Sequence, residues 1–364
     1  MNIREFDVNE FGLLETEWEG LLSKTHAHPL FLSWAWMYSW WNIYSNDNTD
    51  KLALMGVFDD DQKLILIAPL FIKRHNLLKG WLKCNSVRFI GSNIGFRTEY
   101  LQFIVEDQCA SNAIRFLLNE LLDRYDIDEF SLNDIPIDSL TYKIVRDFSN
   151  NNGMYGRVLS SEQSYSINCN DSFESYVSGL GKNTRLKVFN RRKNIKKMGD
   201  IEVSVLGGGE IDKIVKIINE HHRARWGGVT INSKHIEFLS SIKSQDIEIR
   251  SVVLSVDGAD YGCTLDIIRN NTSNNMQSGF LQNSDNKISI GTLLFGYAIE
   301  HYCNSGVLYY DLLAGGGKNS DYKKRIADGY KVLESVHFIH SKKIKLIYYI
   351  NDKAKAFKRR LTKI

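Results

Sequence analysis

Residues 276–324 carry the clearest structural signal in the chain, and they read MQSGFLQNSDNKISIGTLLFGYAIEHYCNSGVLYYDLLAGGGKNSDYKK. Met276–Leu281 and Val307–Leu312 are predicted strands. Between them, a polar loop leads into a helix predicted from about Gly291 to Asn304, and three glycines follow the second strand. Strand, loop, helix, strand and glycine-rich loop in this order predict a helix that packs on a sheet.

The elements on either side extend this sheet. The dipeptide Asp257-Gly258 is a strong hairpin signal, and it joins predicted strands over 247–256 and 259–269. Strands and helices also alternate before residue 149, with a predicted hairpin of 51–58 and 63–72. The fold class is therefore α+β, α/β layered, with a mixed and mostly antiparallel sheet flanked by helices in each half.

The domain boundaries follow from composition. The polar stretch Ser149–Gly153 separates the two halves, and a basic helix is expected at the end of the chain. We therefore predict domains over 1–155 and 156–340, followed by a terminal segment over 341–364. This last segment is partly amphipathic, which would suit either contact with anionic membrane lipid or a solvated helix.

Composition excludes several classes of protein. The 364 residues have a net charge of +3 and only three prolines. The five cysteines form no C-x-x-C pair, so neither a disulfide framework nor a cysteine-rich zinc site is expected, and a reducing compartment fits better. No run of 18 apolar residues and no apolar leader occur, which predicts a cytoplasmic protein without a membrane span.

The start of the predicted helix at Gly291 is a candidate anion site. Free N–H groups and the helix dipole favour negative charge at such a start. Ser289, Gly291, Thr292 and Leu293 lie there, and the small residues permit close approach of a phosphate. An ordinary capped helix is the alternative, because every helix has such a start.

Two clusters of cations add candidate binding residues. The predicted helix over 183–198 includes Arg191 and Arg192 and carries no acid, which fits either a solvated face or a phosphate-bearing ligand. At the end of another helix, His222, Arg225 and Trp226 would either interact with the helix dipole or contact a substrate. No H-E-x-x-H pattern occurs, so no metal site is predicted.

Asp266 lies in the middle of a predicted strand and is expected to be buried. A buried carboxylate needs a partner, so Asp266 is either a structural hydrogen-bond acceptor or a base with an altered pKa. The chain has no G-x-S-x-G elbow and no cysteine in a nucleophile motif.

A family resemblance joins these segments. The segments that carry it are Phe31–Trp41, Ile67–Leu70, Arg185–Arg192, His222–Trp226, Ser289–Leu294 and Asp311–Lys323. Their order resembles the GNAT acyltransferase superfamily, in particular its CelD-like acetyltransferase domain family, which is related to the Fem-type aminoacyl transferases. In the family pattern [QR]-x-x-G-x-[GA] for the pyrophosphate loop, this chain has Asn286 and Ser289 at the first and fourth positions.

The resemblance implies two tandem GNAT-like domains and an acyl-CoA, such as acetyl-CoA, between splayed strands. It implies that Ser289, Ile290, Gly291, Thr292 and Leu293 bind this co-substrate without a metal. Direct transfer to an amine needs a base and a proton donor. The resemblance implies Asp311 or Asp266 as base and Tyr322 as acid or orienting group. It also implies that Lys323 neutralises phosphate or the developing charge, and that Arg225 and Trp226 contact the acceptor.

Three functions remain open at this point. The first is an N-acyltransferase for an amino sugar on a sugar nucleotide or lipid diphosphate, in surface polysaccharide assembly. The second is a Fem-like transferase that takes aminoacyl-tRNA as donor and modifies a cell-wall precursor. The third is a non-catalytic binding protein that keeps the fold. Nucleic acid is expected as a partner only in the second case, and the oligomeric state is not predicted.

Overall fold

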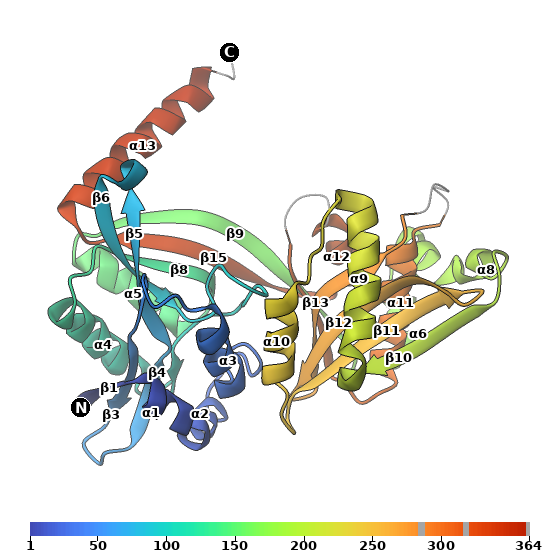
Figure 1. The fold of residues 1–364 in the computed structure, drawn as a ribbon, viewed down its shortest axis with the longest axis horizontal. Coiled ribbons are helices and arrows are strands. Elements are labelled where there is room, and N and C mark those ends of the chain that lie inside the picture. The colour runs from blue at the N-terminus through green and yellow to red at the C-terminus, as the bar shows by residue number, and fades with distance from the viewer. Residues whose placement is uncertain (283–287, 316–319, 362–364) are drawn as a thin grey trace. The chain divides into compact units, whose positions relative to one another are not determined.

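The structure is a computed structural model that describes residues 1–282, 288–315 and 320–361. The chain forms two compact units (Figure 1). The first unit comprises Met1–Ser161 and Val332–Ile364, and the second comprises Glu162–Lys331. The chain enters the second unit within strand β9 (Tyr155–Asn168) and returns within β15 (Gly329–Ile339).

This division differs from the predicted one at its C-terminal side. Residues 332–340 were expected in the second domain and 341–364 as a separate segment. In the structure, β15 pairs antiparallel with β8 (Glu129–Pro136), from Leu333 opposite Pro136 to Ile339 opposite Glu129. Such long-range pairing leaves no local mark in a sequence, so the return of the chain to the first unit could not be seen there.

The first unit contains two sheets. One has the order β1-β3-β4-β7, with strands Asn2–Phe6, Leu54–Phe58, Leu64–Ala68 and Ile104–Val105. The other contains β15, β8, β6 (Leu82–Phe89), β5 (Leu70–Leu77) and β2 (Asp50–Leu52). The predicted hairpin exists between β3 and β4, but its second strand stops at Pro69, which has no N–H for a ladder, and β5 joins the other sheet.

Six helices of the described residues pack on these sheets: α1 (Val8–Leu13), α2 (Glu15–Leu22), α3 (Trp34–Tyr44), α4 (Ala110–Arg124), α5 (Leu140–Asn151) and α13 (Lys342–Leu361). Trp36 and Trp40 of α3 are buried, and the Trp36 indole donates a hydrogen bond to Thr98 Oγ1 (3.0 Å). The tryptophan-rich helix is therefore core packing. In the part of the chain that the structure describes, no helix is long and apolar enough to cross a membrane.

The second unit is built on a sheet of order β10-β11-β12-β13-β14-β9. Its further strands are β10 (Ile201–Gly207), β11 (Glu248–Val256), β12 (Ala259–Arg269), β13 (Thr272–Phe280) and β14 (Tyr309–Ala314). The described helices are α6 (Phe173–Gly179), α7 (Lys182–Arg185), α8 (Arg192–Ile195), α9 (Ile211–Trp226), α10 (Ser233–Ser241), α11 (Ile290–Cys303) and α12 (Ser320–Ile326).

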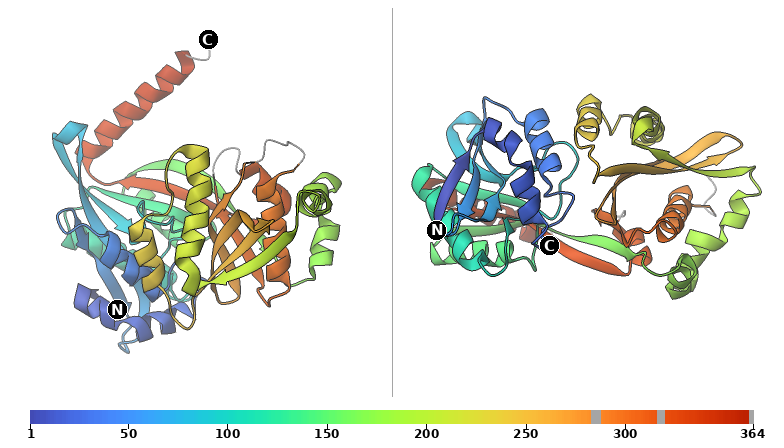
Figure 2. Two further views of the ribbon diagram at one scale, coloured as in Figure 1. Left: turned by 45° about the vertical axis from the view of Figure 1, so that its right-hand side comes forward. Right: turned by 90° about the horizontal axis from the view of Figure 1, so that it is seen from below.

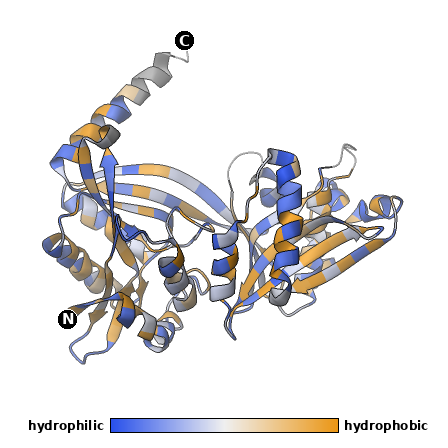
Figure 3. Ribbon diagram, viewed as in Figure 1, coloured by the Kyte–Doolittle hydropathy of each residue, from blue (hydrophilic) through white to orange (hydrophobic). Residues whose placement is uncertain are grey.

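The sheet of the second unit is covered on both faces. Figure 2 shows α9 and α11 on opposite sides of it, and the central strands are mostly apolar in Figure 3. Residues 262–269 of β12 are all buried, as expected for a strand with a helix on each side. The predicted hairpin turn is present, with Asp257 and Gly258 at φ angles of 49° and 77°.

One strand pair of this sheet is parallel and short. β13 and β14 pair only over Thr272–Asn274 and Tyr309–Asp311, whereas β13 continues to Phe280. The other pairs recorded in this sheet are antiparallel. Since β13 and β14 stop pairing after Asp311, they diverge toward their C-terminal ends, where the chain leads to α11 and α12. This is the splay that the family resemblance implied.

Candidate functional site

A cavity of about 330 Å³ lies in the second unit where α7, α11 and α12 meet. Its described lining consists of Asn183, Thr184, Lys187, Thr292, Tyr322, Arg325 and Ile326. Lys187 and Arg325 are exposed cations, and the described lining contains no acid. The cavity therefore offers positive charge and several hydroxyl groups, which suits an anionic ligand.

The start of α11 contributes to this cavity mainly through its backbone and Thr292. The first hydrogen bond within the helix runs from Leu293 N–H to the Ser289 carbonyl (3.1 Å). The N–H groups of residues 290–292 therefore have no acceptor within the helix. The hydroxyls of Ser289 and Thr292 lie 2.9 Å apart. In contrast, Ile290 and Leu293 bury their side chains in a hydrophobic cluster, so they can meet a ligand only through the backbone.

Gly291 has a packing reason for its small size. A Cβ atom there would lie 2.6 Å from the ring of Phe280, at the end of β13. The sequence suggested that this glycine allows a phosphate to approach, but its nearest neighbour is an aromatic ring. A larger residue would push Phe280 away, so Gly291 fixes the distance between α11 and β13.

Tyr322 lines the cavity from α12, and its ring centroid lies 5.4 Å from that of Phe295 on α11. Burial raises the pKa of its hydroxyl above the usual value of 10.0, so the phenol stays protonated near neutral pH. It can therefore act as a hydrogen-bond donor to a developing negative charge.

Lys323 is next to Tyr322 in sequence but points into the protein. Its ammonium group donates hydrogen bonds to the carbonyl oxygens of Leu312 (2.6 Å), Leu313 (2.9 Å) and Ala314 (3.1 Å). These are three consecutive carbonyls at the end of β14. An ammonium group has three N–H donors, so this geometry favours a structural role for Lys323 over the predicted contact with phosphate.

Asp311 lies at the apex of the splay, as the last residue of β14 paired with β13. One carboxylate oxygen accepts hydrogen bonds from Leu313 N–H (2.7 Å) and Ser164 Oγ (3.4 Å), and the residue is 7% exposed. Leu313 has a φ angle of 59°, so the strand bends immediately after the apex. The carboxylate is thus held at the point where the two strands separate.

Asp266 of β12 is fully buried beneath α11. Its carboxylate accepts hydrogen bonds from Asn275 Nδ2 (2.8 Å), Tyr302 OH (2.8 Å), Tyr310 OH (3.0 Å) and the Thr264 hydroxyl. Burial raises its pKa to about 6, although the four donors act in the opposite direction. Of the two interpretations left open by the sequence, this geometry favours the structural one, because the donors come from β12, β13, β14 and α11.

The cluster at the end of α9 is exposed. Arg225 stacks on Trp226 at 4.2 Å and lies 5.7 Å from the ring of Phe280. His222 Nδ1 donates a hydrogen bond to the Gly228 carbonyl (2.9 Å). Trp226 is 58% exposed. Since Phe280 also contacts Gly291, this cluster is linked to the start of α11.

Arg191 and Arg192 lie apart from that cluster. The predicted continuous helix is interrupted by a π-helical turn, η2 (Leu186–Asn190), between α7 and α8. Arg192 forms an ion pair with Glu300 (2.5 Å) and lies 3.9 Å from the ring centroid of Tyr297. Arg191 follows directly on this turn and is partly buried. The side chain of Arg192 is therefore bound by Glu300 and Tyr297 and does not belong to the cluster of His222, Arg225 and Trp226.

The π-helical turn packs closely on α11. A Cβ atom at Gly296 of α11 would lie 2.3 Å from the Val188 carbonyl, so the turn packs directly on α11 at that glycine. This packing brings Lys187 to the cavity. The sequence had shown Lys187 and Arg325 within basic stretches but gave no reason to select them, because their neighbours are also cations.

Part of the predicted site lies outside the described residues. These are Asn286 and Lys287 of the pyrophosphate loop and Gly316, Gly317 and Lys318 of the glycine-rich loop. Of the described candidates, Thr292 and Tyr322 line one cavity, Asp311 marks the apex of the splay, and Asp266 and Lys323 are buried in hydrogen-bond networks.

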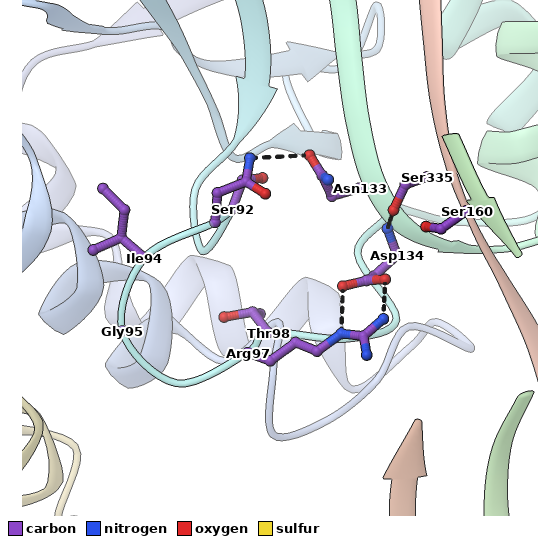
Figure 4. A pocket seen from close by; sticks show the side chains of 10 residues that line it. Ser92, Ile94, Gly95, Arg97, Thr98, Asn133, Asp134, Ser160 and Ser335 are labelled. Carbon is purple, nitrogen blue, oxygen red and sulfur yellow. Dashed lines mark hydrogen bonds and ion pairs between the residues drawn. The ribbon is translucent and has the colours of Figure 1, made fainter. Parts of the chain in front are cut away.

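A second polar cavity of about 330 Å³ lies in the first unit (Figure 4). Arg97 lines it, and its guanidinium donates two hydrogen bonds to the Asp134 carboxylate (2.9 and 2.7 Å). Ser335 Oγ accepts a hydrogen bond from Asp134 N–H (3.1 Å). Because the cation and the acid pair with each other, this cavity offers hydrogen bonds more than net charge.

Comparison with known proteins points to one superfamily. Residues 182–324 match the family described as acetyltransferase (GNAT) domain. No curated protein matches the chain. Among solved structures, FemX has a TM-score of 0.62 at 11% identity, covering 96% of this chain and 100% of that one. At such identity the likeness concerns the fold.

Two further structures have similar folds. A tandem GNAT protein from the clavulanic acid biosynthesis pathway has a TM-score of 0.52 at 11% identity and covers 93% of this chain and 97% of its own. The C-terminal domain of a putative lysylphosphatidylglycerol synthetase from Agrobacterium fabrum has a TM-score of 0.51 at 8% identity, covering 94% and 96%. The tandem GNAT architecture predicted from the sequence is thus confirmed at the level of the fold.

Proposed function

We propose that the chain, which has an acetyltransferase (GNAT) domain match over residues 182–324, transfers an acyl group from an acyl-CoA, such as acetyl-CoA, to an amine. The observation that carries this proposal is the cavity at the start of α11, beside the splay of β13 and β14. Lys187, Arg325 and Thr292 face the same space as the N-terminal turn of α11. This combination suits a pyrophosphate group, because charge and N–H donors act together.

The proposed reaction is direct transfer. The acceptor amine attacks the thioester carbonyl, a C–N bond forms, and the C–S bond breaks with release of CoA thiolate. Asp311, at the apex of the splay, would take the amine proton, directly or through water, and the Tyr322 hydroxyl would donate to the thiolate. Asp266 and Lys323 would hold β12, β14 and α11 in place around these groups.

We further propose that the acceptor is an amino sugar on a nucleotide or lipid diphosphate, used in surface polysaccharide assembly. Arg225 and Trp226 support this acceptor, because an exposed aromatic ring and a guanidinium can contact a sugar and a phosphate. Product formation with amino-sugar nucleotides, compared with the corresponding sugars that lack the amine, tests it. Equal CoA release with both would contradict an amine acceptor.

Membrane contact is proposed for α13 in this setting. Leu346 and Ile350 lie one turn apart on it and are 60% and 58% exposed, and Lys342, Lys343 and Lys353 are also exposed. Such a helix suits a peripheral position at an anionic cytoplasmic leaflet. Co-sedimentation with anionic vesicles but not with neutral ones is expected. Equal recovery with both would contradict this contact.

The binding of the co-substrate is tested by thermal unfolding with acetyl-CoA. The melting temperature should rise with acetyl-CoA concentration, because the ligand binds the native state. Arg325→Ala should weaken binding by at least about tenfold if this cation pairs with a phosphate. Lys193→Ala is the control, since Lys193 of α8 is an exposed cation of the second unit outside the cavity lining.

The alternative donor is aminoacyl-tRNA. The FemX-like fold and the exposed lysines at 182, 187, 193, 196 and 197 favour it as the second candidate. Phosphate-driven RNA binding falls steeply with salt, so tRNA and CoA binding should be compared at matched ionic strength. No response to millimolar acetyl-CoA together with salt-dependent tRNA binding would replace the first proposal. No response to either would favour a non-catalytic protein.

The assignment of the base is tested by Asp311→Asn. We expect turnover to fall at least about tenfold, corresponding to 1.4 kcal/mol or more in the barrier, while acetyl-CoA binding is retained. Asp321→Asn is a control, since Asp321 is exposed on α12. Turnover near that of the unmodified protein would remove Asp311 from the mechanism.

A further inference from the structure

A cluster of polar side chains lies buried in the first unit, whereas the proposed reaction uses residues of the second unit. His75 of β5 and Cys84 of β6 are direct partners across the antiparallel pair. In the parallel pair of β6 and β8, Ser86 lies opposite Glu129. Cys84 and Ser86 are two residues apart and so point to the same face of the sheet. His75, Cys84 and Glu129 thus come together on one face.

The three side chains are close enough to share a ligand. One potential ligand atom from each of His75, Cys84 and Glu129 lies within 4.8 Å of the other two. Bonds of about 2.0–2.3 Å to a tetrahedral ion would place such atoms roughly 3.3–3.8 Å apart. Small side-chain rotations would therefore be sufficient to coordinate one ion, without a change in strand pairing.

Unpaired atoms at this place indicate that a partner is missing from the hydrogen-bond network. The Glu129 side chain is 1% exposed, and its Oε1 accepts a hydrogen bond from Ser86 (3.0 Å). Its Oε2 makes no hydrogen bond of normal length and angle with a described residue, although the Tyr348 side chain interacts with Glu129, and His75 Nδ1 makes none either. A buried carboxylate oxygen without a partner is costly, and a cation would satisfy it.

His337 of β15 adds a further nitrogen. Its Nε2 forms a hydrogen bond with Ser131 (2.7 Å), and its Nδ1 lies 3.8 Å from Glu129 Oε2. Nδ1 also lacks a hydrogen-bond partner within the described chain.

The surrounding charges permit a cation here. Arg88 of β6 is the nearby positive group, and its Nε donates to Ser86 Oγ (3.5 Å) while Glu129 Oε2 stays unpaired. Ile344 of α13 packs in one hydrophobic cluster with Cys84, and Tyr348 borders that cluster. A dication with one thiolate and one carboxylate is neutral overall, which suits burial beneath α13.

We propose that His75, Cys84 and Glu129 bind one Zn²⁺ ion, with His337 Nδ1 placed to complete the set. Nitrogen, sulfur and carboxylate donors together are typical of zinc sites. On binding, the Cys84 thiol would lose its proton to solvent and coordinate as thiolate. The sequence predicted no metal, because the four residues lie on four different strands and form no short motif. The site would stabilise the contact between this sheet and α13.

The test uses the full chain without an affinity tag, stripped with a chelator and then dialysed against Zn²⁺. One zinc per chain is expected by elemental analysis, with a concentration-dependent rise in melting temperature. With Co²⁺ as a probe, a thiolate-to-cobalt charge-transfer band should appear. Cys84→Ser should remove this band, and His75→Ala should weaken zinc binding at least about tenfold.

Matched controls are available in the same unit. Cys109→Ser changes a free cysteine outside the cluster, and His26→Ala changes an exposed histidine, so both should bind zinc unchanged. Circular dichroism establishes that each variant is folded. If Cys84→Ser does not fold, two measurements remain: the cobalt band of the unmodified chain, and the zinc affinity of His75→Ala, which changes a partly exposed residue. No stoichiometric zinc, or equal affinity in His75→Ala, would overturn the proposal.

Discussion

Two buried carboxylates, one in each unit, have opposite surroundings. Asp266 in the second unit accepts four hydrogen bonds from four elements. Glu129 in the first unit accepts one from Ser86, and its other oxygen is unpaired among the described residues. Burial alone therefore does not indicate a functional group. A satisfied carboxylate organises a core, whereas an unsatisfied one points to a ligand.

The largest effect is expected for truncation of these two side chains. Asp266→Ala should lower the free energy of unfolding by about 3 kcal/mol or more, because it leaves Tyr302, Tyr310 and Asn275 without their acceptor. Glu129→Ala in metal-free protein should cost only about 1 kcal/mol, since it removes one hydrogen bond and an unpaired charge. Denaturant unfolding measures both. Equal losses would show that the two carboxylates do not differ as their hydrogen bonds suggest.

A smaller effect is expected in the pH dependence of stability. Burial raises the pKa of Asp266 from 3.8 to about 6, so the folded state binds this proton more tightly than the unfolded state. The resulting stabilisation is complete below pH 3.8 and is lost as pH rises through 6. Relative to Asp266→Asn, the free energy of unfolding of the unmodified protein should fall by up to roughly 3 kcal/mol between pH 4 and pH 7.

The comparison with Asp266→Asn is needed because other groups act in the opposite direction. The pKa values of His75, His301 and His337 are lowered by burial. Their contributions to the free energy of unfolding therefore decrease as pH falls below about 6.5. These histidines are present in both proteins and cancel in the difference. A difference that stays constant from pH 4 to pH 7 would contradict the raised pKa of Asp266.

Much of the second unit could be predicted from local sequence. The apolar runs, the Asp257-Gly258 turn and the helix after Ser289 carry periods and turn residues that act over a few positions. The place of Tyr322 beside the start of α11 could be expected only through the family resemblance. Its neighbours Lys187 and Arg325 could not be selected, since nothing local distinguishes them from other cations.

Local sequence was sufficient to predict the strand and helix periods, the hairpins and the mixed α+β class, because these depend on neighbouring residues. The contacts of Lys323 with three carbonyls, the four elements that donate to Asp266, and the return of β15 to the first unit become visible only in the folded chain. It also brought His75, Cys84, Glu129 and His337 together. These contacts depend on strand register between distant segments, and register is fixed by packing of the whole sheet.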